Sequence, residues 1–154
     1  MLTATAPCSF DSVFETIPEG LGLALGQVFQ YPNRNKFVQF VRANGAVVLN
    51  AAVKIDINFD AVETTELADI VVGVNDNNSE VSVTDNYYFF ATIKGEATVL
   101  QQTGTVLGEL LVASTADGEL MTFDASPSTV QNNNLLALET NASGGTLAKD
   151  ILIL

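Results

Sequence analysis

Short apolar runs separated by turn residues recur along most of the chain, from about residue 27 to its end. The runs are rich in β-branched and aromatic residues, and turn residues interrupt them about every 8–12 positions, a spacing typical of sandwiches and barrels. The clearest unit is segment 37–49, in which Asn44-Gly45 separates two apolar runs. Asn-Gly favours a type I′ hairpin, because both central residues of that turn have positive φ. Segment 110–123 predicts a second hairpin.

Further strands and one short helix are expected around these hairpins. The strands are expected at residues 53–59, 70–74, 80–84, 87–94, 97–101 and 150–154, and turns or loops at 75–79, 85–86, 94–95 and 126–134. Alternation in the first of these strands predicts that Ile55, Ile57 and Phe59 face inward. A helix is expected over residues 61–68, because they favour a helix and Asp60 can cap its start.

The first 26 residues differ from the rest of the chain. They are dominated by Ala, Thr, Pro, Gly and Leu and show no strand alternation, so we expect an N-terminal arm at 1–26 and a single β domain at 27–154. The large apolar residues in the middle of the arm are Phe10, Val13, Phe14 and Ile17. Their helical spacing predicts one or two helical turns that end before Pro18. This apolar face would pack either on its own domain or on a neighbouring chain.

Two segments are apolar on both faces of the strands they predict. The aromatic segment is Tyr87, Tyr88, Phe89 and Phe90, and the aliphatic segment is Ile151, Leu152, Ile153 and Leu154. A half-buried strand needs apolar residues on one face only, so both segments imply a central position or burial against another chain. Because a small domain offers few central positions, the pattern favours an oligomer. All eight residues are candidates for the subunit interface.

The charge balance limits the partners of this chain. Its 154 residues include six Lys and Arg against eighteen Asp and Glu, which gives a net charge of −12. Binding to phosphate backbones uses clustered Lys and Arg, so we expect neither nucleic acid nor an anionic membrane as a partner. Hydrophobic residues make up 47% of the chain, yet no run approaches the about 18–20 residues of a membrane-spanning helix. No secretory signal is recognisable, so synthesis in a cytoplasm is expected.

The residue types leave little room for catalysis. The chain has no histidine, which removes the commonest general base and the His-dependent nucleophile and metal sites. Cys8 is the only cysteine, so no internal disulfide can form, and no cationic neighbour activates its thiol. Residues 56–60 imitate the start of an EF-hand calcium loop, but Ala61 and Leu67 stand where its Gly and Glu belong. We expect no enzyme, no cofactor and no metal site.

The order and spacing of the strands and turns resemble the capsid cement, or decoration, proteins of tailed bacteriophages. The segments that carry the resemblance are 37–49, 69–74, 93–97, 108–112, Asp117-Gly118, 136–140, Gly144-Gly145 and the final apolar strand. The chain lacks the Gly-Asp pair that such proteins often carry near positions 50–52. The fold expected is all-β, a compact β-sandwich or barrel-like domain of the jelly-roll or β-tulip type, with an N-terminal arm and at most one short helix.

The resemblance implies a structural protein of the virion. Such a protein would bind the outer surface of the capsid as a homotrimer, contact the major capsid protein and stabilise the expanded shell by bridging neighbouring subunits. Phe10, Val13, Phe14 and Ile17 would then belong to a capsid-contact arm. Two alternatives remain: a receptor- or carbohydrate-binding β domain of a fibre or adhesin, and a glycoside hydrolase that uses two carboxylates.

Overall fold

Strands and turns make up the part of the protein that the computed structural model describes, which is residues 8–31, 34–76, 82–123 and 134–154. No helix occurs in these ranges, so the all-β prediction is confirmed. The strands are β1 (Val28–Gln30), β2 (Phe37–Ala43), β3 (Ala52–Ile55), β4 (Asp60–Glu63), β5 (Gly73–Val74), β6 (Tyr88–Gln101), β7 (Leu111–Ala113), β8 (Leu120–Thr122), β9 (Leu135–Ala137) and β10 (Leu147–Ile153). The expected loop at 126–134 lies outside these ranges except for its last residue, and so do residues 77–79 of the expected turn and residues 80–81 of the strand expected at 80–84.

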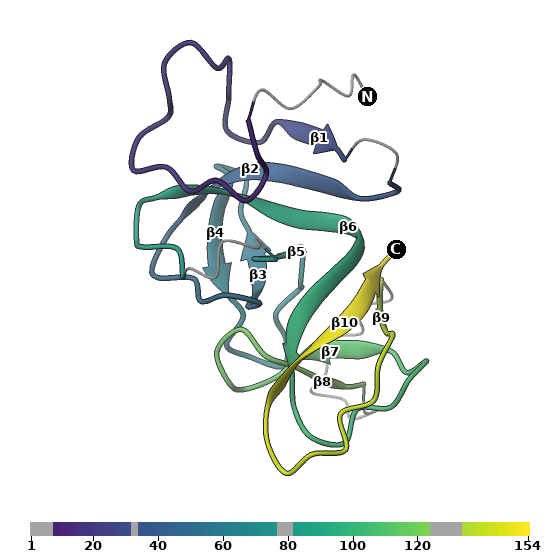
Figure 1. The fold of residues 1–154 in the computed structure, drawn as a ribbon. Helices are drawn as coiled ribbons and strands as arrows, with labels where there is room; N and C mark the ends of the chain where they lie inside the picture. The colour runs from purple at the N-terminus through teal and green to yellow at the C-terminus, as the bar shows by residue number, and fades with distance from the viewer. Residues whose placement is uncertain (1–7, 32–33, 77–81, 124–133) are drawn as a thin grey trace.

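Five of the strands close into a barrel. The order is β2-β4-β3-β5-β6, and pairing between β6 and β2 closes the ring (Figure 1). The barrel is mixed, because β2 and β4 run parallel whereas its other pairs are antiparallel. The remaining strands pack outside it: β1 extends β2, β10 and β9 extend β6, and β7 and β8 pair with each other. Of the two architectures expected, the described residues therefore form the barrel.

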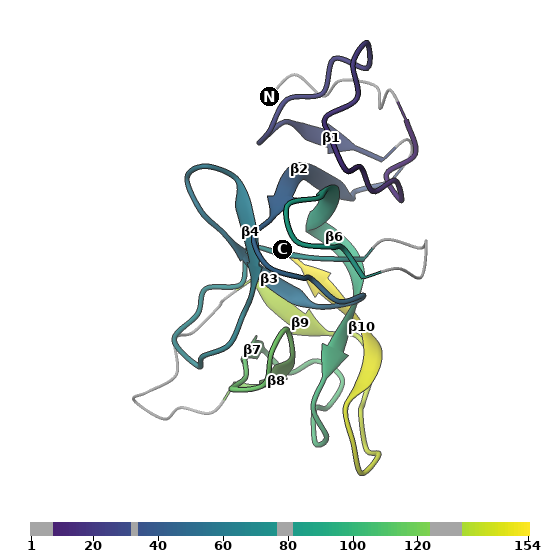
Figure 2. The ribbon, with the colours of Figure 1, turned by 90° about the vertical axis from the view of Figure 1, so that its left-hand side faces the viewer.

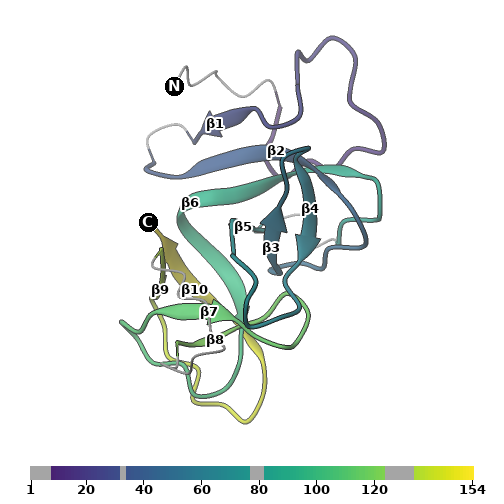
Figure 3. The same cartoon turned by 180° about the vertical axis from the view of Figure 1, so that it is seen from behind.

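The long strand β6 belongs to two sheets. Its first half pairs with β2 in the barrel, and residues 95–101 pair with β10 beyond it (Figure 3). Gly95 stands where β6 passes from one sheet to the other and has a φ of 94°. A Cβ atom at this position would lie 2.4 Å from the Asn35 carbonyl oxygen, so glycine lets the start of β2 approach the bend. The turn expected at 94–95 is wrong, because the strand bends there without ending.

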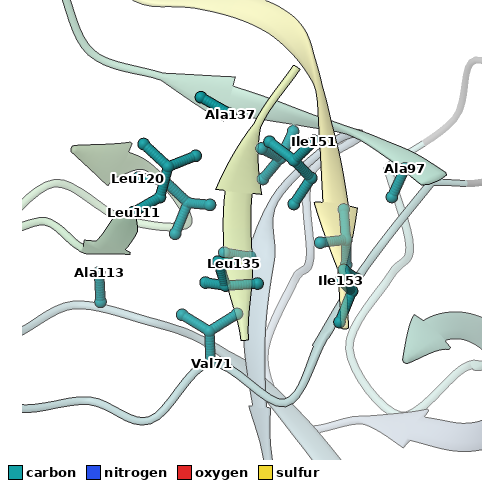
Figure 4. Close-up of a cluster of buried hydrophobic side chains, with 12 residues drawn as sticks. Val71, Ala97, Leu111, Ala113, Leu120, Leu135, Ala137, Ile151 and Ile153 are labelled. Atoms are coloured by element: carbon teal, nitrogen blue, oxygen red, sulfur yellow. The ribbon is translucent and has the colours of Figure 1, made fainter. Parts of the chain in front are cut away.

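Buried side chains form three clusters around this strand. One fills the barrel and includes Val41 and Phe89, and a second lies between β10, β9, β7 and β8 (Figure 4). The third is aromatic and places Phe10 of the N-terminal segment against Phe29 and Phe90. Because neighbouring residues of a strand point to opposite faces, β6 contributes to different clusters from its two sides.

Two predicted elements are wrong because tertiary pairing decides their structure. Asn44-Gly45 does not join a hairpin: Val47 exchanges backbone hydrogen bonds with Val83 and does not pair with β2. The helix expected at 61–68 is absent, since residues 60–63 form β4 and pair with both β3 and β2. In both cases long-range strand partners outweigh the local preference. The hairpin of β7 and β8 is confirmed.

The N-terminal segment 8–26 crosses the top of the barrel in Figure 1 without forming the expected helical turns. Phe14 instead exchanges two backbone hydrogen bonds with Tyr88 at the start of β6, with N···O distances of 2.9 and 2.8 Å. These bonds satisfy backbone groups that a helix would have used internally, so the segment is extended at this point. Phe10 and Leu23 are buried against their own domain.

Candidate functional site

The residues predicted for the subunit interface divide into buried and accessible ones. Phe89, Phe90, Ile151 and Ile153 are buried within their own chain, so in this structure they are core residues and not surface open to a neighbour. Tyr87, Tyr88 and Leu152 are partly buried, whereas Leu154 is 60% exposed. Leu152 and Leu154 lie on the same side of the extended chain. They are therefore the accessible remainder of the aliphatic segment.

The residues predicted for the capsid-contact arm divide in the same way. Phe10 is buried, and its ring centroid lies 5.2 Å from that of Phe90. Val13 and Phe14 are partly buried. Ile17 is 37% exposed, so it alone among the four presents a large part of its side chain to solvent.

One exposed apolar side chain projects from a braced turn between β3 and β4. Ile57 at its apex is 92% exposed. Asp56 Oδ1 accepts the backbone N–H groups of Asn58 and Asp60 at 2.8 and 3.0 Å, and these hydrogen bonds hold the pKa of Asp56 below its usual range. Phe59 in the same turn has a φ of 64°, a conformation that a bulky residue rarely adopts. Hydrogen bonds therefore brace the turn, and Ile57 at its apex faces solvent and not inward as the alternation predicts.

The same turn is tied to the barrel and to the N-terminal segment. Arg42 holds both carboxylate oxygens of Asp60 at 2.7 Å, in a bidentate pair. A Cβ atom on Gly26 would overlap the Phe59 ring, so the backbone of the N-terminal segment lies directly on that ring. We call this turn, with Ile57 at its apex, the arm end of the molecule.

A second pair of exposed apolar residues lies on the loop between β6 and β7, far from the N-terminal segment (Figures 1 and 2). Val106 and Leu107 are 47% and 61% exposed. Their loop is tied to residues 138–146: Gly104 N–H donates to Asn141 O at 2.8 Å, and Asn141 N–H donates to Thr105 O at 2.9 Å. Buried Asn141 adds a side-chain hydrogen bond of 2.8 Å to the Gln101 carbonyl. We call these paired loops the loop end.

A pocket opens where the start of β2, the bend of β6 and the end of β10 meet, on the side of the molecule where Figure 3 shows the C-terminus. Its volume is about 440 Å³, and it is lined by Arg34, Asn35, Lys36, Gly95, Glu96 and Leu152. Glu96 and Leu152 are cross-strand partners, so their side chains share one face of the sheet.

The ammonium group of Lys36 is held in place behind this pocket. It lies 2.5 Å from Asp76 Oδ2 and 5.3 Å from the centre of the Tyr31 ring. Burial, with smaller contributions from the charges of Asp11 and Asp76, raises the pKa of Tyr31 to about 12. Burial also raises the pKa of Asp76, although Lys36 opposes that shift. Lys36 is thus fixed in position, and Asp76 already balances its positive charge.

Ion pairs account for four of the six basic residues. Lys36, Arg42, Lys54 and Lys149 pair with carboxylates. Within the described ranges, no ion pair involves Arg34 or Lys94. Arg34 lines the pocket, and Lys94 precedes Gly95 of its lining. Both basic residues without an ion pair are therefore close to the same pocket.

The acidic and sulfur-containing side chains of the described residues do not gather into a metal-binding cluster. No group of three or more His, Cys, Asp or Glu in these ranges could hold a metal ion. The carboxylates of the EF-hand-like segment brace the turn: Asp56 accepts backbone hydrogen bonds, and Asp60 pairs with Arg42. Burial raises the pKa of the Cys8 thiol, which disfavours the reactive thiolate. Among the residues described, no helix is long and apolar enough to cross a membrane.

No protein-family model matches this sequence, and no curated protein is significantly similar to it. Three of the accessible features described above, Ile57, Leu107 and the pocket, are not predicted from the sequence. The Asp56-x-Asn58-x-Asp60 pattern is the one signal that points to the first of them, because Asp side chains that accept backbone hydrogen bonds build turns. The pocket joins residues from three distant parts of the chain, and no local pattern marks it.

Proposed function

We propose that the protein is a structural virion protein that binds the outer surface of a phage capsid as a homotrimer and bridges neighbouring subunits of the expanded shell. It would be made in the host cytoplasm and act without catalysis or a cofactor. Its direct partner would be the major capsid protein of the same virion. The resemblance in the order of the strands motivates this proposal.

The observation that carries the proposal is the presence of two separate, braced apolar ends. The arm end presents Ile57, and the loop end presents Val106 and Leu107. A protein that bridges two subunits needs two contact surfaces at a distance, each with an apolar centre that becomes buried on binding. Hydrogen bonds hold both ends before binding, which lowers the entropy lost when they dock.

Bridging would stabilise the shell by linkage. A protein that binds the expanded lattice but not its precursor shifts the equilibrium towards the expanded state. Simultaneous contacts raise the overall affinity, because the first contact increases the effective concentration of the second. A trimer carries three times the net charge of −12, so its subunits repel at low salt. Apolar contacts, for which Leu152 and Leu154 are candidates, would have to offset that repulsion.

Co-sedimentation with expanded and precursor shells, built from the major capsid protein of the same virus, tests this function. We expect saturable binding to expanded shells and little binding to precursors. Equal binding to both shells, or binding to neither, would contradict the proposal. A reproducible glycan ligand in place of shell binding would instead support the receptor-binding alternative.

A further inference from the structure

We propose that the pocket between β2, β6 and β10 binds a short peptide segment that carries a carboxylate next to an apolar residue. Such a segment would come from a partner protein, and its recognition does not depend on capsid binding. Three features support this inference. They are the position of Arg34, which forms no ion pair with a described residue, the mixture of donor, acceptor and apolar groups in the lining, and the size of the pocket.

The positive charge of Arg34 stands out against the negative charge of the molecule. The chain has a net charge of −12, yet both basic residues without an ion pair in the described part lie at or beside the pocket. The guanidinium of Arg34 is not engaged by Glu96, although both line the pocket. An exposed guanidinium is a suitable partner for a carboxylate, which it can hold through two parallel hydrogen bonds.

The other lining groups select a peptide over a simple anion. Lys36 keeps its charge matched by Asp76, so it adds little attraction for a second anion. Glu96 is a hydrogen-bond acceptor and would repel a phosphate dianion, whereas it can accept a main-chain N–H group of a peptide. Leu152 provides apolar surface on the same face as Glu96. Arg34 thus matches the carboxylate of a short acidic peptide, Glu96 its main-chain N–H group, and Leu152 its apolar side chain.

The pocket is large enough and rigid enough for such a segment. Its volume of about 440 Å³ lies within the range of roughly 300–1,000 Å³ of small-ligand sites. Its floor is fixed, because Gly95 brings the β6 backbone against Asn35 and Lys36 at a distance that admits no side chain. Lys36 is anchored to Asp76 and Tyr31. A preformed site loses less entropy on binding than one that must be ordered.

Titration of the intact protein with two peptides, monitored through the NMR signals of its backbone amides, tests the site. The probe is acetyl-Leu-Glu-Leu-amide, and the matched control is acetyl-Leu-Gln-Leu-amide, which lacks only the charge. We expect saturable shifts of the Asn35, Gly95 and Glu96 amides with the acidic peptide. The neutral peptide should bind about tenfold more weakly, the change expected when one charge-assisted hydrogen-bonded pair is lost.

Two charge-removing variants locate the binding. Arg34→Gln should weaken binding of the acidic peptide about tenfold. Because Arg34 is exposed, the melting temperature of this variant should match that of the wild type. Lys54→Gln removes the same charge outside the pocket and should leave the affinity within about twofold. No shifts at millimolar peptide, equal binding of the neutral peptide, an unchanged affinity in Arg34→Gln, or tighter binding of inorganic phosphate would each overturn the proposal.

Discussion

Phe89 and Phe90 are neighbours in β6, yet their rings belong to different hydrophobic cores. Phe89 lies with Val41 inside the barrel. Phe90 faces the opposite way, and its ring centroid lies 5.0 Å from that of Phe40 and 5.2 Å from that of Phe10. The N-terminal segment therefore covers the second face of this strand, a face that would otherwise need another chain.

Replacing either phenylalanine by alanine should destabilise the protein. Both rings are buried, with 0% and 2% exposed, so each substitution should cost about 3–5 kcal/mol of unfolding free energy. Chemical denaturation of the purified variants measures this. If either variant unfolded at the wild-type denaturant concentration, its ring would not be a core residue.

Gly95→Ala should also destabilise the fold, through the backbone. The new Cβ would lie 2.4 Å from the Asn35 carbonyl oxygen, at a φ of 94° that L-residues rarely adopt. Strain and steric overlap together should cost roughly 2–5 kcal/mol. Gly144→Ala is the matched control, because nothing lies within 4 Å of its added Cβ. Equal stability of the two variants in thermal unfolding would contradict this account of the β6 bend.

The sequence locates most of the strands, although it divides β6 into two, and it predicts their partners poorly. The hairpin of β7 and β8 is predictable because apolar alternation and turn residues act locally. The fate of Asn44-Gly45 is not, because Val47 pairs with the distant Val83. A pattern that is apolar on both faces shows that both are covered, but it cannot say by which chain. For this reason Phe90 is predicted as an interface residue, whereas Phe10 covers it.

The candidate surfaces are less predictable still. Exposure of Ile57 follows from the Asp56 hydrogen bonds that turn the chain, against the alternation of its neighbours. The pocket depends on a bend in β6 and on the approach of β10, and neither leaves a local signal. The broad fold class is therefore accessible to sequence reasoning, whereas the binding surfaces require the arrangement of distant segments.

Asp56 makes the stability of the arm end dependent on pH. Its folded pKa is lowered, chiefly by the backbone N–H of Asp60, so the carboxylate form stabilises the folded state. This contribution is fully present above the unfolded pKa of about 3.9 and is lost as pH falls through the lower folded pKa. Asp56→Asn keeps a side-chain oxygen acceptor without the charge. Its melting temperature should lie below that of the wild type at pH 6, and the difference should shrink below about pH 4. A constant difference would contradict the assigned role.

The oligomeric state provides an independent check of the proposed function. Light scattering at micromolar concentration and physiological salt should report a trimer. Leu154→Asp should weaken it, because Leu154 is 60% exposed and a charge there opposes burial against another subunit. Ile70→Asp is the control: Ile70 is also apolar and is 61% exposed, but it lies outside the predicted interface, so the trimer should stay intact. A strict monomer for the wild type would rule out trimeric binding.

The most direct test of bridging is the melting temperature of expanded shells with and without bound protein. Wild-type protein should raise it, since bridging stabilises the expanded lattice. Ile57→Ser alters the arm end and Leu107→Ser the loop end; both residues are exposed, so each variant should keep its own stability within about 0.5 kcal/mol. We predict that neither variant raises the melting temperature of the shell as far as the wild type does. If both stabilise the shell as well as the wild type, the two ends do not bridge subunits.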